Sequence, residues 1–541
     1  MSATRSIVPS RHLLASLAAG LALALGAGCS RPEPTLARQQ VLRISQRNEP
    51  ADLDPARSTL PDEFFIIRAL GEGLVTRTPG GGQRPGAAER WEVSPDGLAY
   101  TFHLRENGRW SNGEPVTAAD FLASYRRLLT PATAAPKAAL FFAVKNARAF
   151  VAGQLADFNA VGLQAPDPHT LVVTLERPTP NFLAYASSGP WIPVNPRTVA
   201  RLGREWTRPG NYVGNGPFVL AEWAPHQRIV VKRNPLYADN ARVKLDEINF
   251  LAFDNDDTEE RAYRAGQVDV TMKLPVTKIA TYARENPADL HHAPLAETRY
   301  LSFNTARAPF DDVRVRRALA LALDREKIVS RVVLGGQEPA SRFLASSLRP
   351  RNDSDLPAGS TVRFDPEEAR RLLAAAGFPE GAGFRPVEVS AWSPSQTPVL
   401  EAIQQMWKKE LGIDVTLAIR EGNVHFSALR AGEYDIGFTT AIPDVADAGD
   451  VLKDFVSAAP GNYPHWSDAR YDALVDEASR AADPDQRSGL VRDAEARLGE
   501  LCPVAPLYFN ARNWLMSPRV RGWQEDELWT RFYPSIYLQE N

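Results

Sequence analysis

Histidine is the side chain most often used for acid–base catalysis and for zinc binding near neutral pH. This chain of 541 residues contains eight, of which His291 and His292 are adjacent. Adjacent side chains point apart on any regular element, so this pair is a poor start for a metal site. The others are scattered: His12, His103, His169, His226, His425 and His465. Their spacing predicts no metal site, and nothing in the sequence implies a cofactor.

The common hydrolase and nucleotide motifs are also missing from the sequence. It has no G-x-S-x-G, no H-E-x-x-H, no C-x-x-C and no Gly-Lys-Ser/Thr. Distant residues could still assemble a triad or a carboxylate pair, because geometry rather than spacing defines such sites. An exported hydrolase or a chaperone-like scaffold therefore stays open as an alternative. The sequence favours a protein that is not an enzyme.

The two cysteines have different surroundings. Cys502 lies in the apolar run Leu501-Cys502-Pro503-Val504, which predicts a buried, inert thiol rather than a nucleophile. Cys29 follows a leader in which basic residues precede an uncharged run from Leu13 to Leu25. These flanks and this length predict a secretory signal peptide over residues 1–28 rather than a membrane span.

The residues directly before Cys29 predict a covalent modification. Leu25-Gly26-Ala27-Gly28-Cys29 is similar to the site at which bacterial lipoproteins are cleaved and acylated. The alternative is a plain signal peptide with an incidental cysteine. Either interpretation makes the remaining chain an exported protein. With Cys29 acylated, Cys502 is the only thiol left, so no intramolecular disulfide can form.

Composition describes a large folded body after the leader. The formal net charge of −3 gives no electrostatic signature of nucleic acid or anionic lipid as a partner. No later stretch approaches the roughly 20 apolar residues that a spanning helix needs. The length predicts two or three domains, because single cores stop growing at about 250–300 residues.

Strands and helices alternate irregularly along this body. Leu98 to Leu104 and Leu171 to Leu175 alternate apolar and polar residues, and residues 218–223 and 228–231 flank a turn as a hairpin. Residues 248–253 indicate a buried strand. With no repeat and no regular β-α alternation, the pattern predicts a mixed α/β fold of several domains.

Two helix starts carry clear signals. Asp365-Pro366-Glu367-Glu368 places a cap, a proline and a capping-box Glu in order, and Gly377 ends that helix. Asp312 caps a second helix, whose apolar stripe begins at Val315. Three arginines fall mostly off that stripe, which predicts a solvated face rather than an anion site: Arg314, Arg316 and Arg317.

Several ordered blocks then resemble a known family. They are 308-APFDDVRVRRALALALDR-325, 110-WSNGEPVTAADF-121, 215-NGPF-218, 231-VKRNPLY-237 and 264-RAGQVD-269. The chain is similar, from about Val41 to Leu538, to the extracytoplasmic solute-binding proteins of family 5, the oligopeptide- and dipeptide-binding proteins of ABC importers. The blocks read as caps and turns, so they identify the fold without identifying the ligand.

The resemblance implies a two-lobed periplasmic-binding-protein fold of the Venus-flytrap type, with an extra inserted domain. Lobe I would comprise residues 39–73, 197–297 and 511–541. The inserted domain would be residues 74–196 and lobe II residues 298–510. Ligand would bind in the cleft between the lobes, which close around it at a hinge.

A carboxylate in lobe II holds the free ammonium of a bound peptide in this family. Asp444 aligns with it, and Asp447 falls on a following position. The alternative for Asp444 is a helix N-cap, which Asp447 and Asp450 would join in serving the first turn of the next helix. The bound peptide itself would lie as an added strand.

Departures from the family mark four further positions. Lys137 stands where the oligopeptide binders have an aromatic in the inserted domain, and Glu421 precedes Gly422 where a Glu-Trp pair is usual. Ile442 and Glu297 occupy the positions of a disulfide that this chain lacks. The ligand residues implied are therefore Asp444, Asp447, Ile442, Lys137 and Glu421, with a non-peptide solute as the alternative ligand.

The resemblance also implies the partners and the location. A monomer would capture oligopeptides or dipeptides in the periplasm and deliver them to the membrane subunits of an ABC permease. Acylation of Cys29 would hold the protein at a membrane.

Overall fold

The computed structural model describes residues 2, 39–46, 49–350, 356–524 and 526–540. The chain divides into two compact units, Met1–Gln40 and Val41–Asn541. Cys29 and the predicted signal peptide, apart from Ser2, lie outside the described residues, so the predicted lipidation stays a prediction. Among the residues that are described, no helix has the length and apolar character needed to cross a membrane.

A four-stranded sheet combines residues from the start of the second unit with a later hairpin. Its order is β1-β10-β9-β8, and β1 pairs parallel with β10 while the other pairs are antiparallel. The bounds are β1 Val41–Gln46, β8 Phe218–Ala224, β9 Arg228–Arg233 and β10 Glu247–Ala252. Helix α2, Pro61–Leu70, contributes Ile66 and Ile67 to the core under this sheet.

A second four-stranded sheet is contiguous in sequence. Its order is β4-β5-β7-β6, all antiparallel, with bounds β4 Ala88–Val93, β5 Ala99–Leu104, β6 Leu163–Asp167 and β7 Thr170–Thr174. Helices α3 Ala118–Leu129, α4 Ala147–Val151, α5 Phe182–Ala186 and α6 Pro196–Leu202 follow or separate these strands. The rings of Phe141 and Trp191 stack at 4.0 Å inside the core that this sheet covers.

The largest sheet has six strands in the order β12-β16-β11-β15-β13-β14. The bounds are β11 Leu290–Phe303, β12 Glu338–Pro339, β13 Val387–Ala391, β14 Val415–Ile419, β15 Ile436–Ala441 and β16 Val504–Leu515. β11 pairs antiparallel with β16 on one side and with β15 on the other. Two short antiparallel pairs complete the strands: β2 Val75–Arg77 with β3 Gln83–Pro85, and β17 Val520–Arg521 with β18 Tyr537–Leu538.

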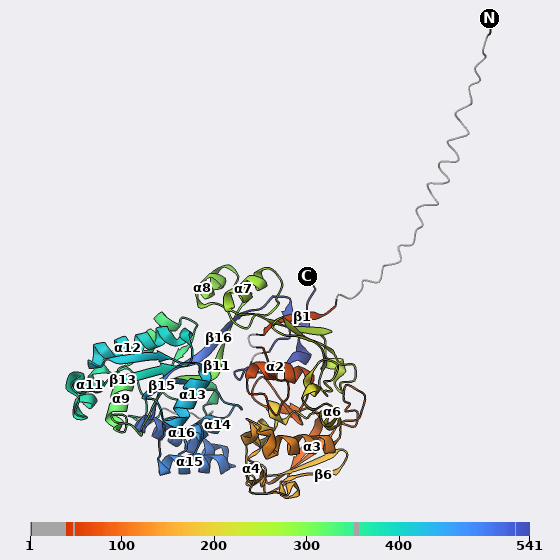
Figure 1. Ribbon diagram of the computed structural model, residues 1–541, viewed down its shortest axis with the longest axis horizontal. Coiled ribbons are helices and arrows are strands. Elements are labelled where there is room, and N and C mark those ends of the chain that lie inside the picture. Colours follow the sequence, from red (N-terminus) through yellow and green to blue (C-terminus); the bar gives the residue numbers. More distant parts are fainter. Residues whose placement is uncertain (1, 3–38, 47–48, 351–355, 525, 541) are drawn as a thin grey trace. The chain divides into compact units, whose positions relative to one another are not determined.

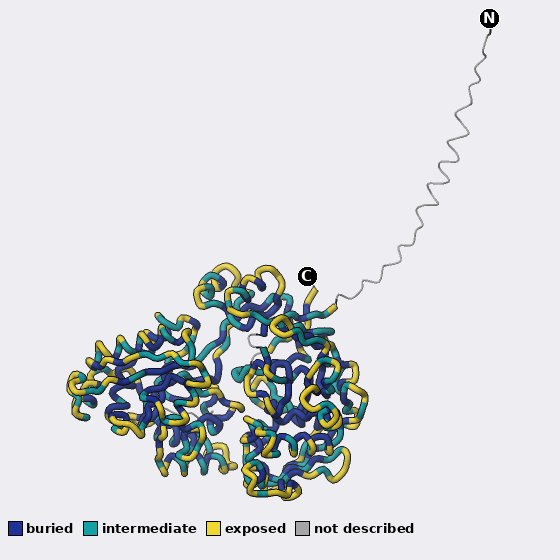
Figure 2. Tube along the Cα trace, viewed as in Figure 1, coloured by how far each residue is buried: buried dark blue, intermediate teal, exposed yellow. Residues whose placement is uncertain are grey.

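Helices cover the six-stranded sheet around two cores. Figure 1 shows α9, α11 and α12 grouped around the part of the sheet that contains β13 and β15. The buried segments of Figure 2 run through the interior of this group. The helices of the second half of the chain are α7 Asp256–Arg264, α8 Val276–Glu285, α9 Val313–Leu321, α10 Arg325–Lys327, α11 Pro366–Ala375, α12 Thr397–Leu411, α13 Gly422–Ala431, α14 Ala448–Leu452, α15 Ala469–Arg480 and α16 Pro484–Leu501.

The predicted strands and caps are present. β5 alternates buried and partly exposed residues, β8 and β9 form the predicted hairpin, and β10 is the predicted buried strand. The Asp365 side chain accepts a hydrogen bond from the Glu368 amide at 3.0 Å, and Asp312 caps α9. Cys502 is fully buried, as predicted, and burial raises the pKa of its thiol.

The prediction that Arg316 belongs to a solvated face is wrong. Its side chain is buried and donates hydrogen bonds to the carbonyls of Phe310 at 2.7 Å and Leu501 at 2.6 Å. Carbonyls at the C-terminal end of α16 therefore draw this guanidinium inward, whereas Arg314 remains exposed. The helix stripe could not predict this, because α16 lies far along the chain.

Candidate functional site

Three aspartates follow β15 at intervals of three residues, and the structure gives each a different task. Asp450, 4% exposed, accepts hydrogen bonds from the backbone amides of Asp444 at 2.7 Å and Val445 at 3.3 Å. Burial raises the pKa of this carboxyl, and the contacting ammonium of Lys453 works against the rise. Asp450 therefore fixes the backbone of residues 444 and 445, in the segment that follows β15.

Asp447 caps the helix that begins after the segment. Its side chain accepts a hydrogen bond from the Gly449 amide at 2.8 Å, at the start of α14. Both carboxylate oxygens also lie 2.7 Å from Nη2 of Arg487. The charge of this predicted ligand residue is thus neutralised within the protein.

The carboxylate of Asp444, unlike those of Asp450 and Asp447, neither holds the backbone of this segment nor caps α14. The side chain is 40% exposed, and Oδ1 contacts Nζ of Lys137. Lys137 is the residue directly before the short 3-10 helix Ala138–Phe141. The structure thus brings together two of the five predicted ligand residues, and the cap of α14 is Asp447 rather than Asp444.

The two remaining predicted residues lie at the end of β15 and at the start of α13. Ile442 directly follows β15 and is 48% exposed. Glu421 caps α13, where its carboxylate accepts a hydrogen bond from the Val424 amide at 3.1 Å. Hydrogen bonds from the Asn423 and Val424 amides lower the pKa of Glu421, as expected for a capping carboxylate. Its hydrogen bonds go to its own helix.

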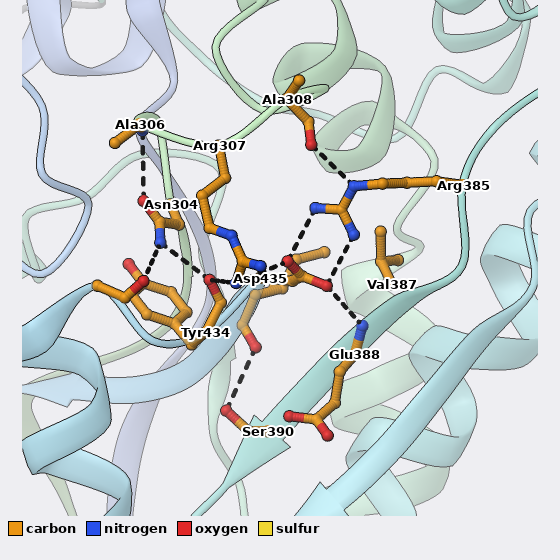
Figure 3. Close-up of polar contacts among 12 residues, drawn as sticks. Asn304, Ala306, Arg307, Ala308, Arg385, Val387, Glu388, Ser390, Tyr434 and Asp435 are labelled. Carbon is orange, nitrogen blue, oxygen red and sulfur yellow. Dashed lines mark hydrogen bonds and ion pairs between the residues drawn. The ribbon is translucent and has the colours of Figure 1, made fainter.

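A polar network fixes the start of β15 and hence the position of the segment that follows it (Figure 3). Two nitrogens of Arg385 reach the carboxylate of Asp435 at 2.8 and 2.9 Å, and Arg307 adds an ion pair at 3.2 Å. The amide of Asn304 side chain donates to the Tyr434 carbonyl at 2.9 Å. Burial would raise the pKa of Asp435, but the hydrogen bonds and charges of the two arginines hold it below its usual range.

The far edge of β15 is only partly covered. β13 pairs with β15 only at Val389↔Ile436 and Ser390↔Gly437. Nε2 of His425 lies 3.0 Å from the carbonyl oxygen of Phe438, within hydrogen-bond distance. Within the part of the chain that the structure describes, residues 439–441 have no strand paired on this side. Such an edge offers backbone donors and acceptors to an incoming extended chain.

Glu297 links this segment to the long strands, a role that the sequence did not reveal. Its buried carboxylate accepts hydrogen bonds from Thr440 Oγ1 at 2.9 Å and Asn510 Nδ2 at 3.0 Å, and pairs with Arg299 at 2.6 Å. The Arg299 guanidinium also lies 5.2 Å from the ring centroid of Trp392. The sequence marks Glu297 only as one half of a missing disulfide, and no local pattern predicts its contacts with Thr440 and Asn510.

A cavity of 450 Å³ lies beside the segment, and Ala446 lines it. Its volume falls in the range of about 300–1,000 Å³ that is typical of small-molecule sites. The other lining residues are mostly small or apolar, with an ion pair between Arg77 and Asp526 at 2.8 Å in the wall: Pro79, Gly80, Gly81, Ala293, Pro294, Ala296, Ser347, Leu348, Glu527 and Leu528. Among the described residues, no group of three His, Cys, Asp or Glu side chains could hold a metal ion.

Comparisons with known proteins agree with this architecture. Residues 82–463 match the family described as bacterial extracellular solute-binding proteins, family 5 Middle. The chain is 34% identical over 495 residues to the probable deoxycholate-binding periplasmic protein YgiS of Escherichia coli, covering 90% of this chain and 91% of that protein. It is 33% identical over 512 residues to the periplasmic oligopeptide-binding protein OppA of Salmonella typhimurium, covering 93% of both.

A solved structure shows the same fold. The crystal structure of Haemophilus influenzae OppA in complex with the peptide RPPGFSPFR superposes with a TM-score of 0.79 at 31% sequence identity. The match covers 93% of this chain and 99% of that one. The two-lobed α/β architecture with mixed sheets is therefore shared along nearly the whole length.

Proposed function

This chain belongs to the bacterial extracellular solute-binding proteins of family 5, and we propose that it captures oligopeptides or dipeptides and delivers them to the membrane permease of an ABC importer. Two relatives carry the ligand class in their names: OppA of Salmonella typhimurium is an oligopeptide-binding protein, and that of Haemophilus influenzae was solved with a peptide. The proposed ligand site comprises Asp444 and the neighbouring edge of β15, and Lys137, Ile442, Asp447 and Glu421 surround or support it.

The exposed carboxylate of Asp444 carries this proposal. Of the three aspartates after β15, Asp447 is neutralised by Arg487 and Asp450 is buried against backbone amides. Asp444 is the one whose carboxylate faces outward, and it already accepts an ammonium, that of Lys137. A peptide with a free amino terminus presents the same chemical group, so exchange of one ammonium for the other needs no new type of contact.

The unpaired end of the β15 edge supplies the second half of a peptide site. An extended peptide can donate to and accept from the partly exposed residues 440 and 441 through its main chain, and this contact is independent of the peptide's sequence. This mode accounts for capture of many different peptides at one site. The cavity beside Ala446 gives room for side chains.

One observation favours a second candidate ligand, an amphipathic carboxylate rather than a peptide. The cavity lining is dominated by small and apolar residues, and Ala441 and Val445, close to Asp444 in sequence, are small or aliphatic. YgiS, at 34% identity, is named as a probable deoxycholate-binding protein. A steroid-like anion would use the apolar walls and the nearby Arg77 instead of the edge of β15.

Native mass spectrometry of the purified chain separates these candidates. Peptide capture predicts a co-purifying ladder of peptide masses bound one to one, and loading with tri-alanine after mild unfolding and refolding. A bound steroid carboxylate with no peptide would support the second candidate. Cleavage of added peptides by the purified protein would contradict the proposal that the chain binds solutes without acting as an enzyme.

We also propose that the protein is a monomer held at the periplasmic side of a membrane through acylated Cys29. Each buried methylene of an acyl chain contributes about 0.8 kcal/mol, so lipid attachment accounts for anchoring without a spanning helix. Cys29→Ala should move the protein from the membrane fraction to the soluble periplasmic fraction. A wild-type protein that is already soluble after cell fractionation would remove the lipoprotein assignment and leave the solute-binding function unaffected.

A further inference from the structure

A second cavity, of 70 Å³, has four arginines in its wall. Arg68 comes from α2, Arg77 and Arg84 come from the β2–β3 pair, and Arg531 comes from the segment before the C-terminal strand. Arg77 also lines the 450 Å³ cavity beside Ala446. The two cavities are therefore neighbours that share a guanidinium.

Positive charge in this small cavity exceeds negative charge. Glu72 is the carboxyl that lines it, and burial raises the pKa of Glu72 to about 7. Asp526 pairs with Arg77 and leaves the other three guanidiniums without a carboxylate at ion-pair distance among the described residues. Burial and the charge of Arg77 lower the pKa of Arg68 to about 10. Grouped, poorly hydrated cations of this kind are costly unless an anion joins them.

Hydrogen-bond donors in the wall also lack acceptors. Arg531 is 5% exposed, and its guanidinium lies 4.0 Å from the ring centroid of Phe65 and 2.9 Å from the sulfur of Met272, a weak acceptor. Its Nε and Nη1 have no carbonyl or carboxylate acceptor within the described chain, and the Tyr533 hydroxyl, which interacts with the Arg531 guanidinium, has no acceptor for its own proton there. Tyr533 is 1% exposed, and the charges of Arg531 and Arg68 act on it, so these groups face one another. Buried, unsatisfied donors of this strength indicate a missing acceptor.

We propose that this cavity binds a small oxyanion, in the class of sulfate, phosphate or a carboxylate group. Guanidinium forks present paired N–H donors that match such oxygens, and the hydroxyl of Tyr533 adds one more donor. The volume of 70 Å³ has room for several waters or for one ion of that size. Because Arg77 lines both cavities, the oxyanion is either a free ion or the carboxylate end of a captured solute. The inference goes beyond peptide capture and does not depend on it.

Calorimetric titration with sodium sulfate at pH 7 and constant ionic strength tests the site in the full mature chain. One sulfate should bind per protein, and Arg531→Met and Arg68→Met should each weaken it by about 10- to 100-fold, as expected for loss of one charge-assisted contact. Arg228→Met is the matched control, since that arginine is exposed on β9 and pairs with Glu222. Absence of saturable binding, or equal affinity in the two cavity variants and the control, would overturn the proposal.

A smaller substitution in the same cavity separates loss of sulfate binding from loss of folding. Tyr533→Phe removes one donor and keeps the ring, and it should weaken sulfate by several-fold while circular dichroism stays unchanged. If Arg531→Met does not fold, an unchanged sulfate affinity in folded Tyr533→Phe and Arg68→Met proteins contradicts the site.

The source of the oxyanion follows from competition. Tri-alanine and its carboxyl-terminal amide are titrated with and without saturating sulfate. If sulfate weakens only the free-acid peptide, the cavity takes the carboxylate of the solute, and if neither is affected, the site binds a free ion. Sulfate binding that depends on Arg531 in a protein that binds no peptide would uphold this inference while removing the proposed peptide function.

Discussion

The ammonium of Lys137 contacts the carboxylate of Asp444 across 307 positions of sequence. One partner precedes a short helix next to the β4-β5-β7-β6 sheet, and the other follows β15. The carboxylate proposed to receive a ligand ammonium therefore has an internal cation as its competitor. Both side chains are partly exposed, so the pair itself contributes at most about 1 kcal/mol and is readily exchanged.

Asp444→Asn should weaken peptides that have a free amino terminus far more than their N-acetylated forms. The amide keeps the shape but loses the charge, and once a bound peptide has excluded water from its ammonium and Asp444, truncating one member of the pair costs roughly 2–5 kcal/mol. Calorimetry on the four combinations of protein and peptide gives the coupling directly, because the two changes should be strongly non-additive. Equal losses for both peptides would assign Asp444 a role in stability only.

Lys137→Met should strengthen binding of free-amine peptides by a few-fold. Removing the competing ammonium leaves Asp444 available, and the gain is limited to the roughly 0.2–1 kcal/mol of an exposed ion pair. Lys145→Met, at an exposed lysine nearby in sequence, is the matched control and should not change the affinity. A loss of affinity in Lys137→Met would instead show that the lysine contacts the ligand directly.

Asp435→Asn should destabilise the region around β15 by about 1–3 kcal/mol at pH 7, since it removes the charge and one of the two oxygens that accept from Arg385 and pair with Arg307. The pKa of Asp435 is held below its usual range, so its stabilisation is present at neutral pH and is lost as pH falls through the lowered value. Urea unfolding at pH 7 and at strongly acidic pH should therefore show a difference that shrinks in acid. Asp414→Asn, at a 77% exposed carboxylate, is the control and should differ little from wild type at either pH.

Glu72 should make the protein less stable as pH rises from about 5 to 8. Burial raises its folded-state pKa from 4.5 to about 7, so the folded state holds a proton that the unfolded state releases over this interval. Glu72→Gln keeps an acceptor for the Tyr237 hydroxyl, which donates at 2.7 Å, and removes the charge. The variant should gain up to about 3 kcal/mol relative to wild type between pH 5 and pH 8.

Urea midpoints across this pH range measure the effect. Glu89→Gln, at an exposed position of β4, should run parallel to wild type throughout. Parallel curves for Glu72→Gln and wild type would mean that Glu72 is ionised in the folded protein at all these pH values.

Short-range patterns in the sequence were sufficient to predict strands, helices and helix caps. The alternation of Tyr100, Phe102 and Leu104 predicted a strand with one buried face, and Asp365 was recognised as a cap from its neighbours alone. Such signals depend on residues within one turn or one strand. The family resemblance then supplied the arrangement of the elements, which periodicity could not.

Side-chain partners from distant segments were beyond those signals. Arg316 was assigned to a solvated face because nothing in its own helix shows the carbonyl of Leu501 that binds it. Glu297 accepts hydrogen bonds from Thr440 and Asn510, which lie on two other strands. For Asp444 the sequence left an anchor and a cap open, and the structure assigns the cap to Asp447 while the anchor stays a prediction.

The position of β16 in the six-stranded sheet determines when that sheet can be completed during synthesis and export. The β4-β5-β7-β6 sheet is built from one continuous stretch of chain, so it can assemble as soon as β7 has emerged during export. β16, by contrast, lies between β12 and β11 although it is the last strand of its sheet in sequence. The six-stranded sheet therefore stays open at β11 until nearly the whole polypeptide has been delivered, and its exposed strand edges need protection from aggregation during that delay.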